Sequence, residues 1–283
     1  MAQRAAKSLT AEPETTAAAE AASPAAGLDR FVGDPQFMQS LARGLLALGA
    51  VAKGRGQPVT AREVAALTGL SVATARRCLY TLNATAYVRA NRLGAVPGAS
   101  LAGLAADYAG SSPIITLGGP ILDELRAELR ESVSLAVFDR GQPTIVATST
   151  SESLLTLDLP VGATLPVHCT SAGKLYLAYL PDEALDRRLR MTDLKAHTDR
   201  TITSPAVLRD ELAHVRRRGF AVSDQELALG IRTVGAPVRN ARGTVIGSVN
   251  LTMLVGAVGL RDLRARVVPA LMRAAARLSA LSA

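Results

Sequence analysis

AREVAALTGLSVATARRCLYTL, residues 61–82, predicts two short helices separated by a tight turn. Gly69 suits the turn because glycine adopts a positive φ without a Cβ penalty, and Ser71 is a suitable N-cap for the second helix. Apolar side chains recur at helical spacing on one face of each helix: Val64, Ala65 and Leu67, then Val72, Ala75, Leu79 and Leu82. This is the pattern of a helix-turn-helix, whose second helix lies in the major groove of DNA.

The other face of the second helix carries short polar side chains and arginine. Arginine holds the O6 and N7 edge of guanine with two hydrogen bonds, while threonine bonds phosphate or contacts the thymine methyl group. A helical hairpin with a solvated, charged face is the alternative interpretation. The predicted DNA contacts are Arg62, Ser71, Ala73, Thr74, Arg76, Arg77, Arg89 and Arg92.

The last two arginines belong to a predicted wing. Residues 87–89 are expected to form a short strand, residues 90–92 a turn and residues 93–96 a returning strand. From this hairpin Arg89 and Arg92 can reach phosphate or the minor groove; a solvated hairpin tip is the alternative.

Charge supports a polyanionic partner. The net charge is +8, and from Gln36 to Ser100 eight Lys or Arg residues stand against one acidic residue. Trp is absent and aromatic residues make up 3% of the chain, which argues against base-stacking platforms for single-stranded nucleic acid. Double-stranded DNA is therefore the expected partner.

Cysteine and histidine usage predicts no metal site, no cofactor and no disulfide framework. The chain has two cysteines, Cys78 and Cys169, without CxxC spacing, and three histidines. Acidic residues interrupt the N-terminal alanines before an apolar core forms, so no signal peptide is expected. No apolar run approaches membrane-spanning length, and a cytoplasmic location without a membrane partner is expected.

The chain is long enough for two domains. Residues 1–35 lack apolar periodicity and are predicted to be a disordered tail. A winged helix-turn-helix domain is predicted for residues 36–97, beginning with a helix that carries Leu41, Leu45, Leu48 and Val51 on one side. A linker helix is predicted for residues 98–112 and a second domain for residues 113–283.

The second domain is predicted to be a mixed antiparallel sheet flanked by helices, which makes the chain α+β. Strands are expected at 134–138, 144–148, 154–159, 233–238 and 244–253. Helices are expected at 114–131, 171–180, 205–218 and 260–281, the last bent at Pro269.

A ligand site is predicted where a loop delivers Ser171 to the start of a helix. Unpaired backbone N–H groups and the positive end of the helix dipole attract a carboxylate or phosphate there. Apolar walls are expected from Leu154, Leu157 and Leu165, and polar groups from Ser223, Asp224, Thr233, Asn250 and Thr252. A small organic acid suits this mixture. The alternatives are that Ser171 only caps the helix, that Asn250 faces water from an edge strand and that Asp224 pairs with an arginine.

Catalysis is the competing interpretation, because His168, Cys169, Ser171 and Lys174 lie close together in sequence and such pairs can make nucleophiles. No GxSxG elbow accompanies them. A Ser/Lys-type hydrolase with an accessory helix-turn-helix is therefore the less favoured alternative, and no enzyme is predicted.

Several blocks resemble the IclR-type transcriptional regulators. FMQSLARGLLALGAVA (37–52), the helix-turn-helix and the following YV resemble the family's winged helix-turn-helix. LPVHCTSAGKLYLAYL (165–180), VRRRGFAVSDQELALGIRTVGAPV (215–238) and GTVIGSVNLT (243–252) resemble its effector domain. The blocks FMQSLARGL and TARRCLYTL are most similar to the subgroup that controls catabolism of protocatechuate, 4-hydroxybenzoate and related aromatic acids through the β-ketoadipate pathway.

The resemblance implies a GAF-like effector-binding domain and a homodimer, often a dimer of dimers, on palindromic promoter DNA. It implies acid contacts at Ser171, Ala172, Ser223, Thr233, Asn250 and Thr252, and an apolar wall at Leu154, Leu157, Leu165 and Ile231. The expected function is regulation of a catabolic operon by a small, aromatic organic acid. A regulator of the same family that responds to a small aliphatic acid, such as glyoxylate or pyruvate, is the alternative.

The sequence departs from the family pattern at several positions. Ser223 stands where some members have Asp, and Thr233 where some have Cys. The wing lacks the aromatic residue often found there, and Ala75 replaces the larger β-branched residue usual in helix-turn-helix units.

Overall fold

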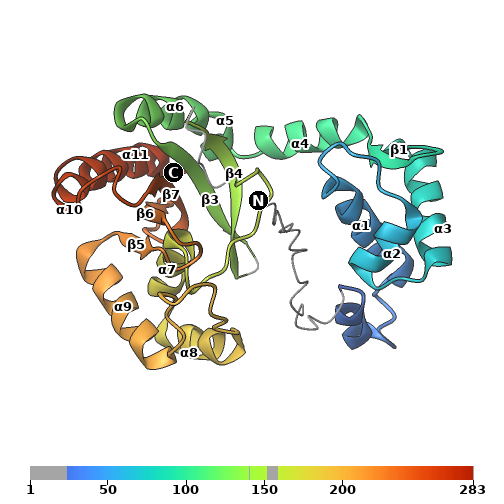
Figure 1. Ribbon diagram of the computed structural model, residues 1–283, viewed down its shortest axis with the longest axis horizontal. Coiled ribbons are helices and arrows are strands. Elements are labelled where there is room, and N and C mark those ends of the chain that lie inside the picture. Colours follow the sequence, from blue (N-terminus) through green and yellow to red (C-terminus); the bar gives the residue numbers. More distant parts are fainter. Residues whose placement is uncertain (1–23, 140, 152–158, 283) are drawn as a thin grey trace, which may run out of the picture. The chain divides into compact units, whose positions relative to one another are not determined.

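The computed structural model describes residues 24–139, 141–151 and 159–282 (Figure 1). It divides the chain into two units, Met1–Asp107 and Tyr108–Ala283. The division falls within helix α4 (Ser100–Gly110), inside the predicted linker helix. The domain boundaries drawn from the sequence stay a prediction. Among the described residues, no helix is both long and apolar enough to span a membrane.

The first unit is a winged helix-turn-helix. Its elements are α1 (Gln39–Ala52), α2 (Ala61–Thr68), α3 (Val72–Ala84), β1 (Val88–Asn91) and β2 (Gly94–Pro97). Gly69 ends α2 with φ 77°, and Ser71 caps α3 by accepting a hydrogen bond from the Thr74 N–H, both as predicted. Thr60 and Glu63 form a capping box at the start of α2, and the bonds from Thr60 lower the pKa of the Glu63 carboxyl.

Two predicted apolar faces of the first unit are wrong in part. The buried stripe of α1 is Ala47, Ala50 and Val51, whereas Leu41 and Leu45 are 57% and 59% exposed. Leu45 is two residues before Ala47 and therefore lies on a different side of the helix, and Leu41 lies one turn before Leu45 on that same side. Leu67 of α2 is also exposed, because Val64, Ala65 and Thr68 form the buried side of this helix and Leu67 lies outside that side.

The prediction of a disordered tail up to residue 35 is corrected at its end. A 3₁₀ helix, η1 (Ala26–Phe31), precedes α1. The Ala25 N–H donates to the Thr68 carbonyl at 2.8 Å, and the Phe31 ring stacks on Phe37 at 4.3 Å. These contacts hold the segment although it lacks apolar periodicity.

The second unit is built on a five-stranded antiparallel sheet in the order β4-β3-β7-β6-β5. The strands are β3 (Ser132–Asp139), β4 (Gln142–Ser149), β5 (Ala221–Asp224), β6 (Ile231–Arg239) and β7 (Val245–Leu254). The helices are α5 (Pro113–Thr116), α6 (Gly118–Leu129), α7 (Ser171–Ala178), α8 (Asp182–Met191), α9 (Pro205–Arg218), α10 (Leu260–Asp262) and α11 (Val268–Ala280), with a π-helix, η2 (Leu263–Val267), before α11.

Helices cover both faces of this sheet. The long helices α6 and α11 pack on one face around the main apolar core, and α7, backed by α9, packs on the other (Figure 1). Strand β7 is the central strand in the sheet order, and because helices cover both faces its side chains are buried on both sides. This arrangement places the start of α7 against the middle strands.

Several elements differ from the prediction. The helix expected at 114–131 is divided between α5 and α6 at Leu117. The helix expected at 260–281 contains a π-helical stretch just before Pro269, which accommodates the backbone hydrogen bond that proline cannot make. Helix α8 and strand β5 were not predicted. The strand expected at 154–159 falls, except for Leu159, outside the described residues.

Candidate functional site: a DNA-binding surface and a buried cavity

The predicted recognition helix presents its arginines to solvent. The side chains of Arg76 and Arg77 on α3 are exposed and make no hydrogen bond or ion pair to any described residue, while Ala75 and Leu79 on the opposite face are buried. Ser71 and Thr74 also bond to each other through their hydroxyls at 2.9 Å. The remaining predicted contacts, Ala73 and Arg62 of α2, are exposed as well.

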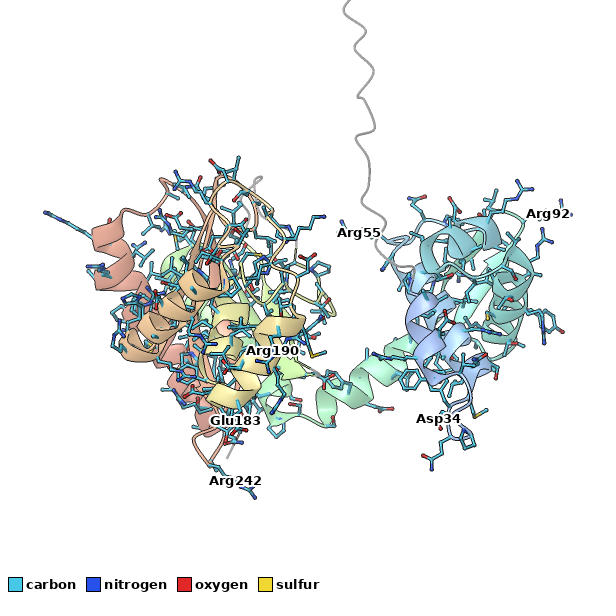
Figure 2. The ribbon with its side chains drawn as sticks, turned by 90° about the horizontal axis from the view of Figure 1, so that it is seen from below. Asp34, Arg55, Arg92, Glu183, Arg190 and Arg242 are labelled. Atoms are coloured by element: carbon cyan, nitrogen blue, oxygen red, sulfur yellow. The ribbon has the colours of Figure 1, made fainter. Side chains whose placement is uncertain are left out.

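The wing is fixed to the recognition helix. The side-chain oxygen of Asn83, on α3, accepts a hydrogen bond from the Ala90 N–H at 2.9 Å. Strands β1 and β2 pair so that Arg92 and Leu93 form the turn, two residues later than the predicted turn begins. Arg92 extends away from the body of the unit (Figure 2), and Arg89 is exposed on β1.

Two exposed side chains on this surface were not predicted from the sequence. Tyr80 is 78% exposed, and it follows Arg76 and Arg77 by four and three residues, so it shares their face of the helix. That spacing was visible in the sequence. Leu93, 72% exposed, occupies the wing tip where an aromatic residue is absent.

The second unit contains a cavity between the start of α7 and the sheet. Seven of the predicted effector residues line it: Leu165, Ser171, Ser223, Ile231, Thr233, Asn250 and Thr252. Strand register explains why polar residues from distant parts of the chain meet here. Thr252 pairs with Thr233, which pairs with Ser223, and the neighbouring row joins Ser134 to Asn250.

In the second row, Asn250 pairs with Gly235, which pairs in turn with Ala221. A Cβ atom at Gly235 would lie 2.6 Å from Asn250 Oδ1 and 3.2 Å from Ser171 Cβ. The glycine thus leaves the space in which Ser171 donates its hydroxyl hydrogen to Asn250 Oδ1 at 3.1 Å. The Asn250 amide in turn donates to the carbonyl and hydroxyl of Ser248, so its side chain is held in one orientation.

Thr233 differs from Ser171, Ser223 and Asn250 in its hydrogen bonding. Its hydroxyl oxygen is buried and has no hydrogen-bond partner. By contrast, the Ser223 hydroxyl donates to the Cys169 carbonyl at 2.7 Å. A buried hydroxyl without a partner costs about 1–3 kcal/mol, which a ligand that bonds to it can offset.

The structure also settles the alternatives left open for single residues. Thr170, not Ser171, caps α7 by accepting from the Gly173 N–H at 3.0 Å. Asn250 lies on the central strand and is 4% exposed, so it does not face water. Asp224 forms a two-bond ion pair with Arg232 and does not line the cavity.

Three further predicted contacts are absent from the described lining. Ala172 points into a small core with Ala136, Ile145 and Leu165, because it lies on the side of α7 facing β3 and β4. Leu154 and Leu157 lie outside the described residues. The lining residues that the sequence analysis did not assign to the ligand are Ser134, Leu159, Cys169, Thr170, Leu227 and Ala228.

The geometry does not support the nucleophile pairs considered from sequence. The Lys174 side chain is fully buried and directs Nζ to Glu226 Oε1 at 2.5 Å and to the Val222 carbonyl at 3.2 Å, while Ser171 bonds to Asn250. Burial, with the nearby Glu226 carboxylate, raises the pKa of the Cys169 thiol to about 12. Neither Ser171 nor Cys169 is therefore activated as a nucleophile.

A winged helix-turn-helix joined to a ligand-binding α/β unit is the construction of an effector-responsive transcriptional regulator. The comparisons with known proteins agree. The IclR helix-turn-helix domain matches residues 40–92, and the bacterial transcriptional regulator IclR C-terminal domain matches residues 106–280. The chain belongs to the IclR family of transcriptional regulators.

Individual relatives share this architecture. The Pca regulon regulatory protein of Pseudomonas putida is 36% identical over 89% of this chain and 87% of its own. The structure of a putative transcriptional regulator, RHA06195, from Rhodococcus sp. RHA1 has a TM-score of 0.76 at 33% identity, over 87% of this chain and 98% of that one. An IclR homolog from Microbacterium hydrocarbonoxydans, solved in complex with 4-hydroxybenzoate, has a TM-score of 0.73 at 21% identity, over 86% and 98% of the two chains. The relatives are named as regulators, and the chain is a regulator rather than an enzyme.

Proposed function

We propose that this regulator controls a catabolic operon in response to an aromatic carboxylic acid, such as 4-hydroxybenzoate or protocatechuate, bound in the cavity beneath α7. The observation that carries the proposal is the buried, unpartnered hydroxyl of Thr233. It lies in a cavity where the Ser171, Ser223 and Asn250 side chains already have partners within the chain.

The cavity offers both kinds of contact that such an acid needs. The first N–H groups of α7 have no intrahelical acceptor, and with the helix dipole they favour a carboxylate. Leu159, Leu165, Leu227 and Ile231 provide apolar surface for a ring. The similarity to a Pca regulon regulator, and to a homolog complexed with 4-hydroxybenzoate, supports an acid of the same class.

The proposed mechanism requires a homodimer on promoter DNA. Met38, Leu41 and Leu45 on and beside α1 are 57–65% exposed, and such a row of large apolar side chains supports a protein partner. The acid is proposed to shift the population in which two helix-turn-helix units are spaced for half-sites about 34–36 Å apart.

Ligand binding is tested by thermal unfolding of the protein with 4-hydroxybenzoate, protocatechuate, glyoxylate and pyruvate. An aromatic acid at 100 times its dissociation constant should add about 2.7 kcal/mol of stability. Thr233→Val should bind about 10- to 150-fold more weakly, because a hydrogen bond to a charged group contributes about 1.5–3 kcal/mol. The ligand-free variant should be at least as stable as the wild type, since the substitution removes an unsatisfied buried hydroxyl.

Thr148→Val is the matched control, because Thr148 is an exposed β4 residue outside the cavity lining. This variant should be stabilised against thermal unfolding by the aromatic acid as much as the wild type is. Stabilisation by glyoxylate or pyruvate alone would overturn the aromatic class in favour of an aliphatic effector, and equal shifts in wild type and Thr233→Val would remove Thr233 from the site.

A further inference from the structure

Three side chains with metal-binding atoms converge beside the cavity. His168 and Cys169 immediately precede α7, and His197 lies in the segment between α8 and α9. One potential ligand atom from each of the three lies within 4.8 Å of the others. We infer that His168, Cys169 and His197 form a binding site for a divalent metal of the zinc class.

The environment of His168 supports this assignment. Its Nε2 atom lies 2.9 Å from the Lys195 carbonyl oxygen, which can only accept a hydrogen bond, so Nε2 carries the proton. The lone pair therefore resides on Nδ1. Metal-binding histidines characteristically donate the second ring N–H to a carbonyl or carboxylate, which fixes both tautomer and ring orientation.

The segment that carries His197 is held in place while the imidazole itself is exposed. The His197 N–H donates to the Thr201 hydroxyl at 3.0 Å, and that hydroxyl donates to the Glu226 carbonyl at 2.6 Å. The centroids of the His168 and His197 rings are 5.8 Å apart. A metal can thus enter from the solvent side, next to His197, and reach two buried ligands.

The donor set selects the metal. Two imidazoles and one thiolate suit Zn²⁺, which prefers tetrahedral nitrogen and sulfur ligands at about 2.0–2.3 Å. Metal binding releases the Cys169 thiol proton to solvent, because only the thiolate is a ligand. Bonds of these lengths place the ligand atoms about 3.3–3.8 Å from each other. The 4.8 Å span of the potential ligand atoms exceeds the longer of these distances by about 1 Å, a difference that a change of rotamer at the exposed His197 side chain can close. The fourth position stays open beside the cavity, because Cys169 belongs to its lining.

The site could not be predicted from sequence spacing, because His197 is 28 residues from Cys169 and these residues form no CxxC or HxxxH pair. The assignment does not depend on the proposed effector. Its test uses metal ions alone, so either proposal can fail without the other.

The test is a titration of metal-stripped, full-length protein with Co²⁺, whose bond to a thiolate produces a charge-transfer absorption in the near ultraviolet. We expect one equivalent of Co²⁺ per chain, displaced by Zn²⁺. Loss of an outer-shell partner alone weakens metal binding about 10- to 100-fold, so His197→Ala should weaken it by at least about 100-fold. Cys169→Ser should abolish the charge-transfer absorption.

The chain supplies matched controls. His214→Ala removes an exposed histidine of α9, and Cys78→Ser removes the other cysteine; both variants should bind Co²⁺ like the wild type. Because Cys169 is buried, the exposed His197 keeps the test decisive if Cys169→Ser does not fold. Absence of the charge-transfer absorption in the wild type, or equal Co²⁺ affinity in His197→Ala, would overturn the assignment.

Discussion

Lys174→Met is expected to lower the free energy of unfolding by about 3–5 kcal/mol, because it removes the partner of a buried carboxylate. Lys174 and Glu226 are 1% and 6% exposed, and their side chains meet at 2.5 Å. Without Lys174, the Glu226 carboxylate would keep its desolvation cost and lose its counter-charge. One of its oxygens, Oε2, is already buried without a hydrogen-bond partner.

Denaturant unfolding of matched variants measures this effect. The double variant Lys174→Met/Glu226→Leu should recover most of the lost stability, since it replaces the pair by apolar groups of similar volume. Arg273→Ala breaks the exposed ion pair with Glu128 and should cost less than about 1 kcal/mol. If Lys174→Met lowers the free energy of unfolding by less than about 1 kcal/mol, Lys174 does not stabilise the buried Glu226 carboxylate.

The loss of stability caused by Lys174→Met should also depend on pH. Burial raises the pKa of the Glu226 carboxyl above its ordinary value, and Lys174 opposes that rise. A carboxyl whose pKa is higher in the folded than in the unfolded state destabilises the fold as pH rises through that range. Removing Lys174 enlarges the difference, so Lys174→Met should be less damaging at pH 4 than at pH 7.5.

Arg76→Ala and Arg77→Ala should each reduce operator affinity by about 1–3 kcal/mol, the discrimination that one good two-bond contact to a base contributes. Both side chains are exposed on α3, and the opposite face packs in the core of the unit. The measurement is fluorescence anisotropy with a duplex that the wild type has selected from random sequences, compared with an unselected duplex at the same salt concentration.

The control for this pair of variants is Arg190→Ala, which makes the same charge change on the exposed surface of α8 in the other unit (Figure 2). It should leave operator affinity within about twofold of the wild type. If both recognition-helix variants bind the selected duplex as tightly as Arg190→Ala, the assignment of α3 as the recognition helix is wrong.

The DNA-binding unit was the more predictable part of the molecule, because its signals are local. The turn glycine and the N-cap serine each act within a few residues of their own position, and the structure confirms both. The predictions of burial failed where the exposure of a side chain depends on which other elements of the fold cover its helix. The apolar spacing of Leu41 and Leu45 predicts burial, but no described element of the unit covers them.

In the second unit, local sequence patterns located the polar residues of the cavity but not the residues with which they pair or bond. The two-residue period placed Asn250 and Thr252 on one strand face, and both line the cavity. It did not show that their strand is central, because strand order joins segments more than a hundred residues apart. Likewise, the partner of Lys174 is 52 residues away, and the unpartnered state of Thr233 exists only in the assembled cavity.

We propose that an acid in the α7 cavity controls DNA binding, and operator affinity measured across an acid titration tests this control most directly. The wild type should change its dissociation constant for the selected duplex by about 5- to 150-fold at saturating aromatic acid, the usual range of allosteric coupling. Thr233→Val should need a higher acid concentration for the same change. An unchanged operator affinity, at acid concentrations that stabilise the protein against heat, would contradict the account.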